Sequence, residues 1–250
     1  MEIITLASRP DLAEALFAFP GAWPPFMYED PTSDLYYDDA ATAYPEFVML
    51  AIEGGQVVAR SFSVPFRWDG DPGTGLPEGG WDWVIRSAHA QRTAGIQANL
   101  VSALEITIQV EHRGTGLAAL MLGAMQQNVA RLGFADLIAP VRPNGKPSHP
   151  DEPMDAYAWR TRDDGLPEDA WLRVHVRSGG RIVNVAHLSM TIAGTLEQWR
   201  TWSGLPFAVS GPVHVPGALV PVVCEPAHDF AVYVEPNVWV HHRLPSAASR

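Results

Sequence analysis

The chain has 250 residues, of which 47% are apolar and 18% charged, and its net charge is −11. This composition predicts a folded globular protein with a substantial core and excludes a disordered chain. The acidic balance argues against a nucleic acid or an anionic membrane surface as partner. The single cysteine excludes an intrachain disulfide, and no apolar run is long enough to cross a bilayer. The N-terminus lacks a signal-peptide pattern, so we expect a cytoplasmic protein.

The first hundred residues predict mostly short elements. We expect a strand at 3–6, a helix at 12–19, a hairpin with strands at 47–53 and 56–65, and an irregular helix at 81–92. Residues 23–39 are rich in aromatic and acidic side chains. This segment is either a loop with a short helix packed on the sheet or a surface that binds a cationic ligand.

The middle of the chain gives the clearest pattern. Residues 104–110 alternate, with Leu104, Ile106, Ile108 and Val110 on one face and Glu105, Thr107 and Gln109 on the other, which predicts a strand. Apolar residues at helical spacing follow over 117–132, and 135–141 is an apolar run. A strand–helix–strand unit of this length predicts a right-handed crossover between parallel strands.

The second half predicts a long loop and further short elements. The loop covers 142–164, with one helical turn near 156–159. A helix is expected up to residue 178, although the alternation of Leu172, Val174 and Val176 also fits a strand. Beyond it we expect a helix at 195–202 and strands at 181–186, 218–224, 231–234 and 238–242.

The turn between the central strand and helix, Arg113-Gly114-Thr115-Gly116-Leu117-Ala118, carries the main functional signal. Glycines at a helix N-terminus let backbone N–H groups approach an anion, which the helix dipole also favours. A dinucleotide fingerprint does not fit, because three residues separate the strand from the glycines and because Asp136 begins the next strand. A P-loop is excluded because the turn has no Gly-Lys-Ser/Thr.

With its flanking strand and helix, this turn resembles the GNAT acyltransferase superfamily, whose pyrophosphate-binding pattern is Q/R-x-x-G-x-G/A. The resemblance covers roughly 47–141. It implies an α/β fold with a mixed twisted sheet, helices on both faces and a β-rich C-terminal extension. We expect one domain, with its core at about 1–189 and the extension at about 190–250.

The same resemblance implies the cofactor site. The coenzyme A pyrophosphate would bind Arg113, Gly114, Thr115, Gly116, Leu117 and Ala118. Pantetheine and the thioester carbonyl would bind the backbone of Ile108, Gln109 and Val110, where the strand splays from its neighbour. Acetyl-CoA or another acyl-CoA would be the co-substrate.

Two side chains are candidates for proton transfer. Glu105, on the polar face of the central strand, is either the base that deprotonates an amine or an exposed strand carboxylate. His175 stands four residues before Gly179, where similar enzymes carry the tyrosine that protonates the leaving thiolate, and Tyr157 is the alternative acid. The histidines lack metal-ligand spacing, so we expect no metal.

These observations predict an acyl-CoA-dependent N-acyltransferase that moves acetyl to a small-molecule amine by direct attack. Two alternatives stay open. One is an acyl-CoA hydrolase or decarboxylase on the same fold, and the other is a non-catalytic acyl-CoA-binding protein. A homodimer is also among the expectations.

Overall fold

The computed structural model describes residues 1–245. Within this range the chain forms one mixed nine-stranded sheet in the order β1-β2-β3-β4-β5-β9-β8-β7, with β6 paired to the other edge of β9. The strands are β1 (Glu2–Thr5), β2 (Val48–Glu53), β3 (Gln56–Phe66), β4 (Leu100–Ile108), β5 (Asp136–Val141), β6 (Gly180–Gly194), β7 (Gly211–Val213), β8 (Val222–Glu225) and β9 (Phe230–Arg243). The β4–β5 pair is parallel, as expected, and the other pairs are antiparallel.

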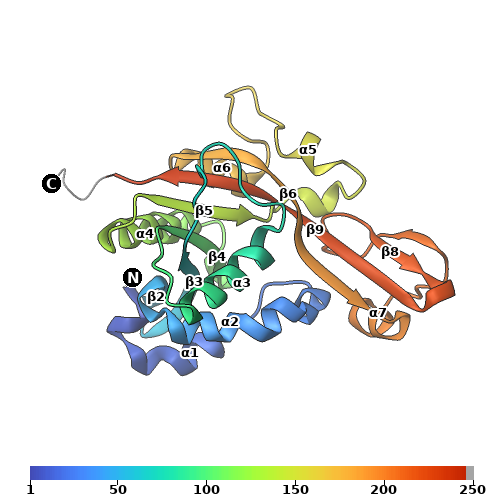
Figure 1. Ribbon diagram of the computed structural model, residues 1–250, viewed down its shortest axis with the longest axis horizontal. Coiled ribbons are helices and arrows are strands. Elements are labelled where there is room, and N and C mark those ends of the chain that lie inside the picture. The colour runs from blue at the N-terminus through green and yellow to red at the C-terminus, as the bar shows by residue number, and fades with distance from the viewer. Residues whose placement is uncertain (246–250) are drawn as a thin grey trace.

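Helices cover both faces of this sheet, which confirms the expected fold class (Figure 1). One buried cluster joins the sheet to α1, α2 and α3, and a second joins it to α4, α5 and α6. The helices are α1 (Ala13–Phe17), α2 (Pro31–Ala43), α3 (Gly80–Thr93), α4 (Leu117–Arg131), α5 (Met154–Tyr157), α6 (Ala170–Arg177) and α7 (Leu196–Ser203). No helix among the described residues is both long and apolar enough to span a bilayer.

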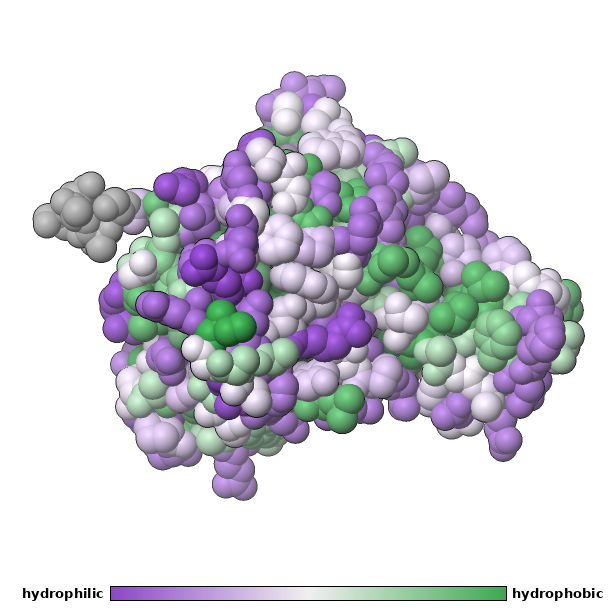
Figure 2. All heavy atoms as spheres, in the orientation of Figure 1, coloured by the Kyte–Doolittle hydropathy of each residue, from purple (hydrophilic) through white to green (hydrophobic). Residues whose placement is uncertain are grey.

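Strand β9 connects the two ends of the molecule. Its first half pairs with β8 and its second half with β5, while β6 follows it along the opposite edge. In Figure 1 both long strands run from the body into an arm that also carries α7, and Figure 2 shows apolar side chains gathered over this arm. The sequence predicts two strands here. They are one strand, and Pro236 lies in the interval between Val232, the last residue paired with β8, and Val238, the first paired with β5.

Two further helices each begin at an Asp that caps the first turn. Residues 31–43 form a full helix because Asp30 caps it, accepting from the backbone N–H groups of Thr32 and Ser33, and because Pro31 occupies the first turn. The segment 170–177 is the helix α6, which confirms the helix expected up to residue 178 and excludes the alternative of a strand. Asp169 caps α6 by accepting from the N–H groups of Trp171 and Leu172.

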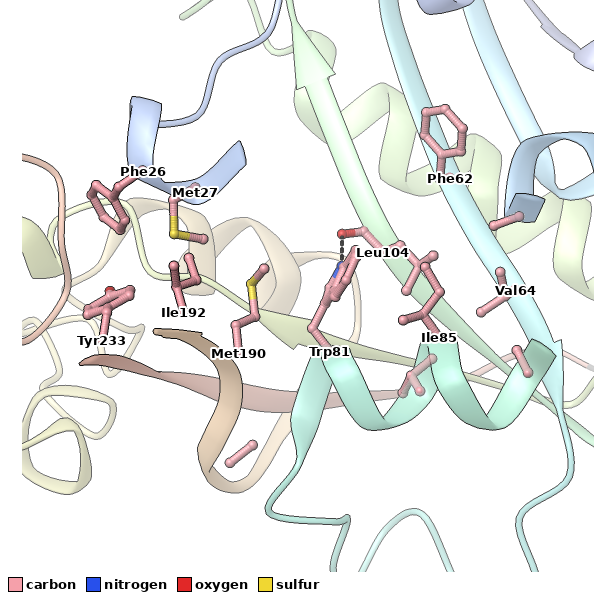
Figure 3. Close-up of a cluster of buried hydrophobic side chains, with 14 of the residues drawn as sticks. Phe26, Met27, Phe62, Val64, Trp81, Ile85, Leu104, Met190, Ile192 and Tyr233 are labelled. Carbon is pink, nitrogen blue, oxygen red and sulfur yellow. Dashed lines mark hydrogen bonds between the residues drawn. The ribbon is translucent and has the colours of Figure 1, made fainter. Parts of the chain in front are cut away.

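The alternation predicted along the central strand is wrong at its first residue. The pairing of β4 with β3 shifts register between Phe62 and Ser63, so that Leu104 is the extra residue of a β-bulge. Leu104 consequently packs in the cluster of α3, whereas Ile106 and Ile108 pack against the cluster on the α4 face. The Leu104 carbonyl accepts a hydrogen bond from the indole Nε1 of Trp81 at 3.1 Å (Figure 3).

Candidate active site

A cavity of about 710 Å³ opens where β4 separates from β5. The two parallel strands pair at Val101 and Ser102 and then diverge, which leaves the cavity-side edge of β4 from Ala103 to Ile108 without a partner strand. Pro140 lies in β5 two residues after Ile138, the last residue of β5 that pairs with β4, and it has no N–H to donate to β4. The bulge and this proline together explain why the strands part here.

The glycine turn closes one end of the cavity. Gly116, with φ +88°, caps α4, and the N–H groups of Leu117 and Ala118 lie at the start of the helix, where no intrahelical partner exists. Arg113, Gly114, Gly116, Leu117 and Ala118 all line the cavity. The free N–H groups and the helix dipole at the N-terminus of this 15-residue helix favour the binding of a pyrophosphate.

Three of the predicted cofactor residues do not line the cavity. Strand β4 ends at Ile108, and Gln109 turns back to β3, with its N–H on the Val58 carbonyl and its side-chain amide on the Val57 carbonyl. Val110 begins a 3₁₀ turn, is 67% exposed and lies outside the cavity lining, so the predicted contact of its backbone with the thioester carbonyl stays a prediction. Thr115 uses its hydroxyl to close the turn, donating to the His112 carbonyl.

Glu105 lies in the cavity wall and is buried, so the alternative of an exposed strand carboxylate is excluded. Its Oε1 accepts from Arg60 Nε at 2.8 Å and from the Thr107 hydroxyl at 2.6 Å. Its Oε2 accepts from the Tyr37 hydroxyl at 2.6 Å and from Trp23 Nε1 at 3.4 Å. Because a carboxylate has about four acceptor sites, a substrate amine must displace one of these donors to reach Glu105.

The cavity contains a second buried carboxylate, Glu235 on β9, which sequence reasoning missed. It accepts from Arg142 Nε at 2.9 Å, from the Tyr233 hydroxyl at 2.7 Å and from the Asn237 amide at 3.1 Å. The signal in the sequence was a Glu and an Asn inside the otherwise apolar strand 231–240, since such residues are seldom buried without a partner. Each cavity carboxylate is thus matched by an arginine.

The wall opposite the glycine turn is aromatic. Trp23, Tyr28, Tyr37 and Trp81 line it, and they come from the loop and helix at 23–39 and from the start of α3. Figure 3 shows Trp81 and Met190 in one buried cluster, and both side chains also line the cavity. The segment at 23–39 packs on the sheet, as one of the two alternatives expected, and it also lines the cavity. Binding of a cationic ligand there stays a prediction.

His175 also lines the cavity, from the inner face of α6. It is almost fully buried, and its Nδ1 lies 2.9 Å from Nε2 of His242. Burial first, and then the neighbouring His242, hold the pKa of His175 well below its ordinary range. The ring is consequently neutral at pH 7, which argues against the predicted role as an imidazolium acid and leaves a neutral N–H as the group it can offer.

Tyr157, the alternative acid, does not line the cavity. Its hydroxyl donates to Asp169 Oδ2 at 3.1 Å, and burial raises its pKa above the ordinary range. The same carboxylate caps α6, so Tyr157 helps to fix the helix that carries His175. Among residues 1–245, no group of three or more His, Cys, Asp or Glu side chains is arranged to hold a metal ion.

Comparison with known proteins assigns the family. No family model matches the sequence. The arginine N-acetyltransferase avaD of Aspergillus versicolor is 34% identical over 96% of this chain and 93% of its own length. The chain belongs to the GNAT superfamily. It is an N-acetyltransferase, as the sequence predicts.

Solved structures agree on the fold. The loading GNATL domain of CurA from Lyngbya majuscula has a TM-score of 0.58 at 14% identity, covering 97% of this chain and 96% of that one. The GphF GNAT-like decarboxylase, solved with isobutyryl-CoA, has a TM-score of 0.54 at 15% identity, covering 98% of this chain and 100% of that one. At these identities the GNAT fold is what the chains share.

Proposed function

We propose that this enzyme transfers the acetyl group of acetyl-CoA to the α-amine of arginine. The observation that carries the proposal is the single cavity that joins the glycine turn, the open edge of β4 and the aromatic wall. The relative that is 34% identical over nearly the whole chain acts on arginine by its name. Arginine also fits the wall, because a guanidinium stacks on Trp and Tyr faces.

The turn and strand have distinct tasks. The N–H groups of Leu117 and Ala118 hold the pyrophosphate. Gly114 and Gly116 border open space, in which no protein atom lies within 4 Å of a Cβ position, and the lack of side chains leaves that space to the pyrophosphate. The unpaired edge of β4 between Ala103 and Ile108 binds the pantetheine arm. When bound, acetyl-CoA supplies an acyl group activated as a thioester.

The α-amine is preferred over the guanidinium for a chemical reason. An α-amine has a pKa near 8 and a guanidinium a pKa above 12, so the first reaches its neutral, nucleophilic form far more easily. During transfer the amine nitrogen bonds to the carbonyl carbon, the C–S bond breaks, and the nitrogen loses one proton as the sulfur gains one.

The test is thiol release from acetyl-CoA with a panel of amines, followed by NMR of the product. Arginine and its methyl ester should support release, and Nα-acetylarginine, whose α-amine is blocked, should not. Turnover of Nα-acetylarginine would overturn the choice of nitrogen.

Two further readouts address the alternatives. Release without any amine would identify a hydrolase, and conversion of malonyl-CoA to acetyl-CoA would identify a decarboxylase. A thermal shift with acetyl-CoA but no turnover of any kind would identify a binding protein. As a check on the wall, Trp23→Ala should raise KM for arginine more than KM for acetyl-CoA.

A further inference from the structure

Two histidines from distant parts of the chain meet beside the cavity. His175 lies on α6 and His242 near the end of β9, and both are buried. Their rings are joined by a contact of 2.9 Å between His175 Nδ1 and His242 Nε2. One of these two nitrogens must carry the hydrogen, and the contact alone does not say which.

The contacts of Gln126 on α4 show which of the two histidine nitrogens donates the hydrogen bond. Its side-chain nitrogen lies 3.0 Å from the carbonyl oxygen of Ser178 and 2.8 Å from His242 Nδ1. A carbonyl oxygen accepts and never donates, so the atom that faces it must be the amide NH₂ group, and the orientation of the amide follows from this contact. The same NH₂ group then donates to His242 Nδ1, which must be the bare nitrogen of that ring.

This assignment fixes the direction of the whole hydrogen-bond chain from Gln126 through His242 to His175, which we call the relay. With Nδ1 bare, the neutral ring of His242 carries its hydrogen on Nε2 and donates it to His175 Nδ1. His175 in turn carries its own hydrogen on Nε2. That atom has no hydrogen-bond partner within residues 1–245, and His175 lines the cavity.

The relay is protected from protonation. Burial lowers the pKa of His242 to about 4 and holds that of His175 well below 6.5. The ring of Trp171 meets that of His175 edge-on at 4.6 Å. The Ser178 carbonyl partly offsets the effect of burial on the pKa of His242, whereas the neighbouring His241, which is bonded to Asp136, lowers that pKa further. Both rings are therefore neutral at neutral pH. A cationic ring would donate from both nitrogens and would have no bare Nδ1 to accept a hydrogen bond.

We propose that His242 is a positioning residue that fixes His175 as its Nε2–H tautomer, so that a neutral imidazole donates a hydrogen bond into the cavity at the sulfur of the coenzyme. This hydrogen bond stabilises the negative charge that the sulfur gains as the C–S bond breaks. The sulfur finally receives a proton from solvent, and the proton lost by the amine leaves to solvent, so His175 ends each cycle unchanged. The catalytic part of this inference rests on the proposed function, whereas the tautomer does not.

The direct test is ¹⁵N NMR of the imidazole rings in the wild-type protein at pH 7.5, with His175→Gln used to assign the signals. The expected result is a protonated Nε2 and a bare Nδ1 on both His175 and His242. A His175 ring with its hydrogen on Nδ1 overturns the proposal, whether or not any variant folds.

Variants test the consequence for catalysis. His242→Gln can keep an amide N–H toward His175 Nδ1, whereas His242→Leu removes it. The Leu variant should lose at least about tenfold in kcat, as expected for one hydrogen bond to a charged group, with KM for acetyl-CoA little changed. The Gln variant should recover most of this loss. The matched control is His241→Leu, the neighbouring histidine, which bonds Asp136 and lies outside the cavity lining.

The outcomes separate this inference from the proposed function. Unchanged kcat in His242→Leu, with the His175 tautomer lost, would overturn the positioning role. Equal losses in the Leu and Gln variants would also contradict it. The predicted tautomer in a wild-type protein that acetylates no amine would instead overturn the proposed function and leave the assignment of the rings standing.

Discussion

Replacement of Glu105 by Gln tests the most heavily bonded group of the cavity. The carboxylate accepts from four donors, and one of them is the guanidinium of Arg60, which is only 9% exposed. A glutamine at this position keeps one acceptor oxygen and has no charge, so Arg60 becomes a buried cation without a counterion. Breaking a buried ion pair from one side costs about 3–5 kcal/mol. That is a large share of the roughly 5–15 kcal/mol by which domains are stable.

The assay is urea unfolding followed by tryptophan fluorescence, with a second variant as control. Arg60→Met combined with Glu105→Gln removes both charges and should recover most of the loss, because a pair removed as a whole leaves no buried charge behind. Thr107→Val removes one neutral donor and should cost about 1 kcal/mol. A loss under about 1 kcal/mol for Glu105→Gln, or a double variant no more stable than the sum of the single changes, would refute the reasoning.

The same variants separate two roles of Glu105 in catalysis. If Glu105 is the base, every variant without the carboxylate loses about 10²–10⁴ in kcat, however stable it is. If Glu105 only balances the buried charge of Arg60 and so stabilises the fold, activity returns together with stability in the double variant, which has neither charge. The four occupied acceptor positions favour the second result.

Three further predictions follow from groups at defined positions. Burial raises the pKa of Asp82 to about 7, so the folded state holds this proton more tightly than the unfolded state and stability falls as pH rises from about 4 to 7. Asp82→Asn should therefore gain about 2–3 kcal/mol more at pH 8 than at pH 5 in urea unfolding, and an equal gain at both would contradict this. Burial lowers the pKa of His242 to about 4, so on acidification the unfolded state binds this proton before the folded state does. The free energy of unfolding therefore decreases as pH falls below 6.5. The wild type should lose about 2 kcal/mol between pH 7 and pH 5, and His242→Gln should not show this loss. Gly116→Ala puts a side chain on a residue with φ +88°, so it should cost about 1–2 kcal/mol of backbone strain and raise KM for acetyl-CoA. The control is Gly133→Ala, at φ +93° beyond the other end of α4, which should cost the same strain energy and leave that KM unchanged.

The strand, glycine turn and helix at one end of the cavity could be predicted because their signals are local. The glycine turn, the preceding strand and the following helix are contiguous, and their spacing alone distinguishes an anion-binding helix start from a nucleotide fingerprint. The exact end of the strand could not be read in the same way. Gln109 continues the apolar–polar alternation, yet its N–H and side chain bond to β3, and no pattern within 104–110 reports that partner.

The chemical end of the site depends on contacts between distant segments. His242, Gln126 and His175 come from three separate elements, and none of the three positions looks unusual in its own stretch of sequence. The pairing of Glu105 with Arg60 also needs the register of β3 against β4, which a bulge at Leu104 sets. Burial then changes what each group can do, as it does when it keeps His175 neutral.

The position of β9 has a consequence for how the protein is made. A ribosome releases the chain from its N-terminus, so strands β1 to β5 emerge as an incomplete sheet whose β5 edge stays unpaired until residues 238–243 of β9 follow. During that interval the edge presents unpaired backbone groups and the apolar residues of β5 to any other chain nearby. We expect a nascent chain that stalls before β9 to be a substrate for chaperones or to aggregate, whereas the finished chain closes its own sheet with its last strand.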